Sequence, residues 1–242
     1  MNTVIESGFL LINKPVGMSS YGCIGFLKRI IKQKIKIGHA GTLDPFASGL
    51  LIVAFHRQAT RLLSSIMTME KTYIATGKCG ELTDTLDCTG TVIATNNTIP
   101  SEQDLQKALA FFGSSYEQIP PIYSALKHEG NPLYALARNK QVDLEQLHII
   151  AENKRRTVQL YEVQFLSYEP PYFTIQARVS HGTYIRTFIN DIAECAGSCA
   201  TTYQLARTVI GPFNLSQAAE LTQINSIEDI NQRIIPESIL PV

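Results

Sequence analysis

No stretch of this 242-residue sequence reaches the roughly 18 to 20 consecutive apolar residues that a membrane-spanning helix needs. The N-terminus, residues 1–6, also lacks the basic and then apolar layout of a signal peptide. These two absences argue against membrane insertion and against secretion. We therefore expect a cytoplasmic protein that binds no membrane, and we expect it to act as a monomer.

Cysteine is scarce and scattered. The five cysteines are Cys23, Cys79, Cys88, Cys195 and Cys199. No two of them have the Cys-x-x-Cys spacing of a zinc ligand pair, and an odd, widely spaced set makes a poor disulfide framework. We therefore expect five reduced thiols and no metal site.

The formal net charge is +0, which gives no reason by itself to expect a nucleic-acid partner. The distribution of charge is uneven, however. Residues 1–80 hold ten Lys and Arg residues and three acids, whereas the chain after Ser216 is mildly acidic. A basic N-terminal part fits a face that contacts phosphates, although a solvated basic helix explains the same pattern.

Apolar runs, capping residues and turn residues predict the secondary structure. Ser19 or Ser20 can cap a helix that runs to about Gln33, and Ser101 with Asp104 opens another helix in the manner of a capping box. The predicted strands cover residues 8–13, 50–54, 71–77, 157–168, 172–180 and 202–210, and the predicted helices cover residues 20–33, 58–67, 102–112, 132–139 and 185–196. Hairpin-linked strands without a steady β-α-β rhythm favour an α+β fold with a mixed, largely antiparallel central sheet flanked by helices and loops.

One carboxylate, Asp44, lies in a segment that we expect to be a tight loop, residues 38–45. Gly38 and Gly41 permit unusual backbone geometry, and Pro45 biases the acid toward an extended conformation. An ionised carboxylate held in this way can attack a sugar carbon or an activated ring carbon. The alternative interpretation is that the Asp-Pro pair merely starts a turn.

Three further side chains can serve such a carboxylate. Arg186 and Tyr184 lie where a predicted strand meets a predicted helix, and an arginine can hold a carboxylate through two hydrogen bonds. Tyr73 lies in the middle of a predicted strand, where its ring can stack on a base. Each also has an ordinary interpretation, as a surface arginine or as a tyrosine of the core.

Several motifs, in order along the chain, resemble those of the TruB family, the bacterial tRNA pseudouridine-55 synthases. The similar segments are residues 8–20, 38–51, 71–73, 118–125 and 182–187. The second of these, which reads GHAGTLDPFASGLL, resembles the catalytic-aspartate motif of the family. The resemblance runs from about Gly8 to Phe213.

The resemblance implies the pseudouridine synthase fold and isomerisation of the uridine at position 55 in the T-loop of tRNA. The glycosidic C–N bond breaks, the base rotates and a C–C bond forms, so substrate and product are isomers and no cofactor is expected. The partner is then the T-arm of tRNA. Extruding a base costs less from a loop than from a duplex, which suits a T-loop target.

The resemblance also implies roles for individual residues. Asp44 corresponds to the nucleophile, Tyr73 to the residue that stacks on the flipped base, and Arg186 to the partner of the aspartate. Tyr184 and Leu205 would line the base pocket, His39 would fill the space left in the RNA loop, and Lys14 would support the site.

The same resemblance divides the chain. Residues 1–215 correspond to the catalytic domain, in which residues 119–153, with Lys127, His128, Arg138 and Lys140, resemble a flexible insertion that folds over the RNA. Residues 216–242 are expected to form a short tail and no full PUA domain.

Two alternatives to this function stay open: a non-catalytic RNA-binding protein or tRNA chaperone, and a pseudouridine synthase that acts on another structured RNA. A glycosidase is disfavoured because no second acid pairs with Asp44.

Overall fold

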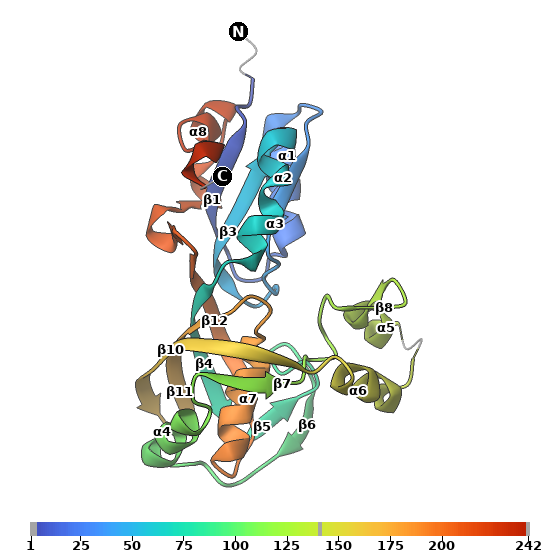
Figure 1. Cartoon of the computed structure of the whole chain (residues 1–242), viewed down its shortest axis with the longest axis vertical. Helices are drawn as coiled ribbons and strands as arrows, with labels where there is room; N and C mark the ends of the chain where they lie inside the picture. The colour runs from blue at the N-terminus through green and yellow to red at the C-terminus, as the bar shows by residue number, and fades with distance from the viewer. Residues whose placement is uncertain (1–3, 140–141, 241–242) are drawn as a thin grey trace. The chain divides into compact units, whose positions relative to one another are not determined.

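The computed structural model describes residues 4–139 and 142–240, so Lys140 of the predicted insertion lies outside the described residues. The chain folds into two compact units (Figure 1). The first unit takes its described residues from 4–73 and 205–240, and the second takes them from 74–204. The predicted catalytic domain, residues 1–215, contributes to both units.

The first unit is built on strands of which β1 (Gly8–Lys14) and β3 (Ser48–Phe55) are buried on both faces. The other strands are β2 (Ile37–Ala40), β13 (Phe213–Asn214), β14 (Ala219–Glu220) and the end of β12 (Ala200–Ile210). Strand β3 pairs antiparallel with β1 and β2 and parallel with β12, and β14 pairs parallel with β1. Sheets buried on both faces read as continuous apolar runs, as the LLIVAF sequence of β3 does.

Helices cover both faces of these strands. On one face, Leu10 of β1 and Val53 of β3 pack against Leu27 of helix α1 (Ser20–Ile31), whose first turn is capped by the side chain of Ser19. On the other face, Leu11 and Ile52 pack with residues of two short helices, α2 (His56–Arg61) and α3 (Leu63–Thr68). The alternation of side chains along each strand therefore supplies two core layers.

The second unit contains a sheet in the order β12-β4-β11-β10-β7. The strands not yet described are β4 (Lys71–Cys79), β7 (Ser115–Gln118), β10 (Arg156–Glu169) and β11 (Tyr172–Val179). Helix α7 (Ile185–Cys195) lies against this sheet (Figure 1). Gly77 of β4 permits the close approach of α7 to the sheet, because a Cβ at Gly77 would lie 2.7 Å from Ile189 of α7 and 2.6 Å from Phe173 of β11.

Smaller elements complete the second unit. They are α4 (Glu102–Phe111), the hairpin of β5 (Glu81–Thr83) and β6 (Val92–Thr95), and the elements β8 (Lys127–His128), β9 (Asn131–Pro132), α5 (Leu133–Arg138) and α6 (Leu144–Glu152) of the predicted insertion. The insertion has a hydrophobic cluster of its own, in which Ile122, Leu136 and Leu147 are buried.

The predicted fold class is confirmed: the sheet is mixed and largely antiparallel, with helices on its faces. Two local predictions are wrong. Residues 37–40 form strand β2 instead of the start of a loop, because their backbone pairs with that of Ile52–Phe55. The helix predicted over residues 58–67 is broken at Leu62, which caps the end of α2 and the start of α3.

The described residues after Ser216, 217–240, pack into the first unit. Strand β14 lies beside β1, and helix α8 (Ile227–Asn231) places Ile230 in the same cluster as Leu27. Ile235 also exchanges two backbone hydrogen bonds with Phe9, each 2.8 Å long. This segment is therefore part of the core of the first unit.

Candidate active site

Asp44 lies half-buried in the connection between β2 and β3. The segment that follows β1 holds this connection from the side. The Ser20 hydroxyl, itself buried, accepts a hydrogen bond from the Leu43 amide at 2.9 Å, and the Gly17 amide donates to the Pro45 carbonyl at 2.7 Å. The carboxylate thus extends from a backbone that is fixed on both sides of it.

Lys14, at the end of β1, is fully buried and supports the same loop. Its Nζ donates to the carbonyl oxygens of Pro15 and Met18, at 2.9 and 2.6 Å, and to that of Pro45 at 3.4 Å. Burial lowers the pKa of Lys14 to about 8, and the charge of Arg207 acts in the same direction, while Cys23 and Asp44 oppose it. The lysine is therefore a structural cation that lies close enough to Asp44 for an electrostatic interaction between them.

Arg207 of β12 is also buried, with 1 % of its surface exposed. Its Nε donates to the carbonyl oxygen of Leu50 at 2.9 Å, and its Nη2 donates to that of Gly41 at 3.0 Å. Gly49 lets β12 approach β3, because a Cβ at Gly49 would lie 2.3 Å from the Arg207 oxygen. The arginine therefore joins the Asp44 loop to two strands.

Two more titratable groups surround this arginine. The Lys71 Nζ donates to the carbonyl oxygens of Met67 and Met69, and burial together with Arg207 lowers the pKa of Lys71 to about 8. Burial and Arg207 also lower the pKa of His39. The His39 Nδ1 is buried without a hydrogen-bond partner among the residues that the structure describes. This part of the first unit thus holds three buried basic side chains, Lys14, Lys71 and Arg207, and Asp44 lies near the first of them.

Tyr73 and Leu205 are both buried side chains, 9 % and 8 % exposed, on the paired strands β4 and β12. Thr208 of β12 donates its hydroxyl to the Thr72 carbonyl at 3.3 Å, beside Tyr73. The two strands therefore bring Tyr73 close to the stretch of β12 that carries Leu205 and Arg207.

Arg186 lies in the first turn of α7 and is 3 % exposed. Its Nη1 donates to the Thr85 carbonyl at 2.5 Å and lies 3.7 Å from the Asp87 carboxylate. Its Nη2 donates to the Tyr123 carbonyl at 2.7 Å. The ion pair with Asp87 is not predicted from the sequence, since the two residues are 99 positions apart.

Tyr184 precedes α7 as its N-cap, and its side chain makes no capping hydrogen bond. The Arg156 guanidinium lies 5.0 Å from the centre of the Tyr184 ring, a cation–π arrangement, and also donates to the Gly182 carbonyl. The amide of Gln118 binds the backbone of Tyr184. Tyr184 and Arg186 are therefore fixed by partners that lie far away in the sequence.

The seven predicted site residues divide between the two units. Lys14, His39, Asp44, Tyr73 and Leu205 belong to the first unit, and Tyr184 and Arg186 belong to the second. Asp44 and Arg186 belong to different units, and their pairing stays a prediction. Sequence reasoning does not single out Arg207, Asp87 or Gln118 as site residues, although Gln118 opens one of the segments that resemble the TruB family.

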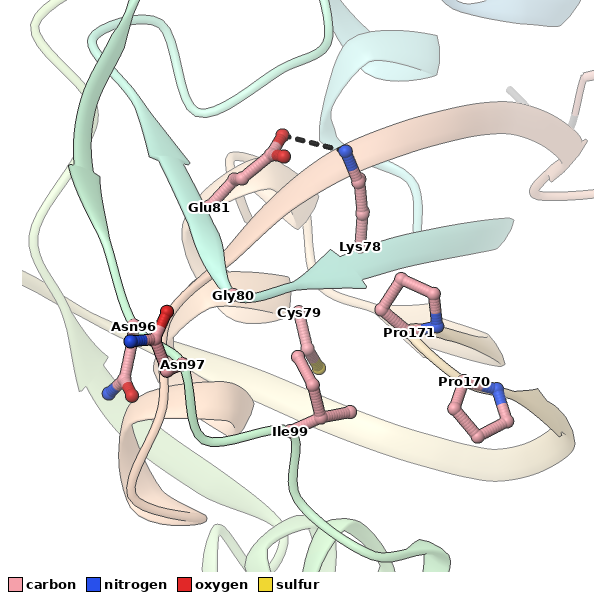
Figure 2. Close-up of a pocket in the computed structure, with 9 residues that line it drawn as sticks. All are labelled: Lys78, Cys79, Gly80, Glu81, Asn96, Asn97, Ile99, Pro170 and Pro171. Atoms are coloured by element: carbon pink, nitrogen blue, oxygen red, sulfur yellow. Dashed lines mark ion pairs between the residues drawn. The ribbon is translucent and has the colours of Figure 1, made fainter.

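A cavity of about 470 Å³ lies elsewhere in the second unit (Figure 2). The Lys78–Glu81 ion pair, 2.7 Å long, lies on one side of it, and Ile99 and the Pro170–Pro171 turn lie on another. None of the predicted site residues lines this cavity.

Within residues 4–139 and 142–240, no three His, Cys, Asp or Glu side chains gather closely enough to hold a metal ion. No described helix is both long and apolar enough to span a membrane.

Residues 28–185 match the family described as TruB family pseudouridylate synthase (N terminal domain). The tRNA pseudouridine synthase B of Bordetella avium (strain 197N) is 39% identical over 237 residues, which cover 97% of this chain and 93% of that protein. The chain belongs to the TruB family. The tRNA pseudouridine synthase B of Protochlamydia amoebophila (strain UWE25) is 36% identical over 94% of this chain and 83% of its own length.

Solved structures agree with this TruB fold. A structure of a Cbf5-Nop10-Gar1 complex superposes with a TM-score of 0.70 at 24% identity, over 95% of this chain and 60% of that chain. A structure of an H/ACA RNP bound to a substrate RNA gives a TM-score of 0.64 at 24% identity, over 90% of this chain and 52% of that chain. At this identity the likeness shows the fold, and this chain spans little more than half of those proteins. The resemblance to the TruB family that the motifs predict is thus confirmed.

Proposed function

We propose that this chain is a tRNA pseudouridine synthase that isomerises the T-loop uridine at position 55, as a monomer in the cytoplasm. Its TruB relatives named tRNA pseudouridine synthase B are matched over nearly the whole of this chain. The observation that carries the proposal is the Asp44 loop, which is hydrogen-bonded on both sides and surrounded by buried cations. A protein that only binds RNA needs no carboxylate facing phosphates.

Asp44 acts as the nucleophile in this proposal, attacking the uracil ring or the anomeric carbon of the ribose. The ionised carboxylate is the reactive form, and the buried Lys14 lies close enough to Asp44 for the two charges to interact. Breaking the C–N bond and forming a C–C bond within one nucleotide consumes no oxidant or reductant. The reaction therefore needs only a fixed nucleophile, a pocket for the detached base and a route for one proton.

The remaining predicted residues form the pocket. Tyr73 stacks on the flipped base, Leu205 packs against it, and His39 enters the space that the base leaves in the RNA loop. Tyr184 lines the pocket and Arg186 pairs with Asp44. The partners of Arg186, above all Asp87, keep its guanidinium oriented before any RNA binds, and such preorganisation lowers the cost of reaching the reactive geometry.

Exposed basic side chains of the first unit would hold the RNA backbone. Lys28, Arg29 and Lys32 on and just after α1 are exposed, as are Lys34 and Lys36. In contrast, Lys14 and Lys71 are buried and bind carbonyl groups. The exposed cations of α1 and the following turn are therefore the candidates for phosphate contacts.

The insertion, residues 119–153, is proposed to close over the T-arm. It has a small hydrophobic cluster of its own, and its exposed Lys127 and Arg138 can meet phosphates. The segment after Ser216 contributes mainly to the core of the first unit, so we assign the RNA contacts to the rest of the chain.

The test is a conversion assay on unmodified tRNA made by transcription, followed by mapping of pseudouridine at single-nucleotide resolution. We expect one pseudouridine, at position 55, and none in a matched tRNA whose position 55 is cytidine. Conversion of a different uridine, or of uridines in another structured RNA alone, would overturn the substrate assignment. Tight tRNA binding without any conversion would favour a binding protein or chaperone instead.

A further inference from the structure

Helix α7, which carries Arg186, begins without a cap of its own. The first backbone amides of a helix lack partners within the helix, and an N-cap side chain usually supplies one. Here the N-cap is Tyr184, whose side chain cannot fold back onto these amides. A residue from strand β7 binds the backbone of this N-cap residue.

That residue is Gln118, at the end of β7. Its Oε1 accepts a hydrogen bond from the Tyr184 amide at 2.7 Å, and its Nε2 donates to the Tyr184 carbonyl at 3.0 Å. The same carbonyl accepts the first helical hydrogen bond of α7, from the Phe188 amide at 3.1 Å. Gln118 therefore binds both polar groups of the residue at which the helix starts.

Gln118 is itself fixed. It is 1 % exposed, its backbone is paired with Arg156 of β10, and its Nε2 also donates to the Tyr116 hydroxyl at 2.5 Å. The Tyr116 hydroxyl in turn donates to the Asp191 carboxylate at 3.0 Å. Asp191 lies seven residues after Tyr184 on the same face of α7, so β7 holds the helix at two points that are two turns apart.

This double attachment determines where Arg186 lies. Arg186 follows Tyr184 by two residues, and its guanidinium binds Thr85, Asp87 and Tyr123, which all belong to other segments. If the first turn of α7 shifted, these three contacts and the Tyr184 ring would shift together. A displacement of about 1 Å at a reacting centre can cost roughly 100-fold in rate.

We propose that Gln118 is a positioning residue for the isomerisation, which sets the start of α7 and thereby orients Tyr184 and Arg186. This inference rests on the proposed function of the chain. Gln118 acts through those two residues and needs no contact with the RNA.

The test uses single-turnover conversion of tRNA with enzyme in excess, because it separates two kinds of defect. A purely structural defect lowers the fraction of active molecules, which raises the total enzyme concentration needed to reach the maximal rate, while the rate constant at saturating enzyme stays. A positioning defect lowers the rate constant at saturating enzyme. The variant is Gln118→Met, which keeps the size of the side chain and removes its hydrogen bonds. Gln103→Met, at an exposed glutamine of α4, is the matched control.

For Gln118→Met we expect a rate constant lower by about 10- to 100-fold at saturating enzyme, and a tRNA dissociation constant within about threefold of the wild type. A second variant, Gln118→Glu, keeps the acceptor for the Tyr184 amide and loses the donor to the Tyr184 carbonyl. Its rate constant should therefore lie between that of the wild type and that of Gln118→Met. It also decides the question if Gln118→Met does not fold.

Wild-type rate constants at saturating enzyme in the folded Gln118 variants would overturn the inference and leave the proposed function intact. A wild-type chain that does not convert tRNA would overturn the proposed function and this inference with it. The two failures are therefore distinguishable.

Discussion

The Nη2 atom of Arg207 donates a hydrogen bond to the carbonyl oxygen of Gly41, 3.0 Å away and 166 residues earlier in the chain. Gly41 has a positive φ of 74°, which glycine adopts without strain, so its carbonyl can face the buried arginine. Three residues later the chain reaches Asp44. The loop of Asp44, the proposed nucleophile, is thus anchored to the core by a buried charged group.

Replacing this arginine by lysine should damage the loop although the charge is kept. Arg207 binds the Leu50 carbonyl through Nε and the Gly41 carbonyl through Nη2, and a single ammonium group cannot reproduce this fork of two separate nitrogens. For Arg207→Lys we expect a loss of about 2 kcal/mol in the free energy of unfolding, measured with urea. The control is Arg233→Lys, at an exposed arginine with one hydrogen bond to the Asp229 carbonyl, which should change stability by less than about 0.5 kcal/mol. Equal effects in the two variants would contradict this role of Arg207.

Removing the charge of Asp44 should abolish the reaction and spare binding. We expect Asp44→Asn to slow conversion of tRNA by at least about 1000-fold, because an amide is a poor nucleophile. Its tRNA dissociation constant, measured by filter binding, should stay within about threefold of the wild type. Asp143→Asn, at an exposed aspartate of the insertion, is the control and should convert tRNA normally. An unchanged yield of pseudouridine from Asp44→Asn would refute the assignment of the nucleophile.

Neutralising Lys28, Lys32 and Lys36 together should weaken the salt dependence of tRNA binding. Each phosphate contact releases about one counterion, so the slope of log K against log salt should become shallower by about two to three. Titrations between low and moderate salt measure this slope. Lys107→Gln, at an exposed lysine of α4 in the second unit, should leave it unchanged. A triple variant with the wild-type slope would mean that these lysines do not meet phosphate.

Asp191 should make the stability of the protein depend on pH. Burial raises the pKa of Asp191 to about 7; the hydrogen bond from Tyr116 opposes this rise and the charge of Glu194 adds to it. The unfolded chain has the ordinary aspartate pKa of about 4, so the folded state binds more protons between these values. The contribution of Asp191 to stability is therefore complete below about pH 4 and lost as the pH rises through 7.

The variant Asp191→Asn removes this dependence while keeping an acceptor for the Tyr116 hydroxyl. We expect its free energy of unfolding to exceed that of the wild type by about 1–2 kcal/mol at pH 8, and the difference to shrink as the pH falls to 5. Asp229→Asn should have the opposite sign at pH 8, since hydrogen bonds from Asn225 and Ser226 hold the pKa of Asp229 below its usual value. A stability difference independent of pH would contradict the prediction for Asp191.

Elements whose signals are local could be predicted from the sequence. Ser19 caps α1, and Ser101 and Asp104 form a capping box at the start of α4, because both motifs act within one turn. Strand β2 could not be predicted, since residues 37–40 become a strand only through pairing with β3. Helix α6 is absent from the prediction for a similar reason: it is stabilised by packing of Leu147 with Leu133 and Leu136 in the insertion.

The candidate site shows the same division. Asp44, Tyr73 and Arg186 lie in motifs that the sequence displays directly. The residues that fix them are less visible, because Arg207 contacts Gly41 and Gln118 contacts Tyr184 across 166 and 66 residues. A buried cation or amide gives no periodic signal, and its partners here are backbone groups, which every residue has. Such residues can be found only once the distant segments are seen side by side.

The hydrogen bond between Arg186 and the Tyr123 carbonyl has a mechanical consequence. Ile122 belongs to the small core of the insertion, and its neighbour Tyr123 is tethered to the arginine on one side and, through its hydroxyl, to Asp84 on the other. The insertion therefore cannot swing freely from its first residues. If a bound RNA displaces the insertion, the displacement acts on the hydrogen bond between the Tyr123 carbonyl and the guanidinium of Arg186.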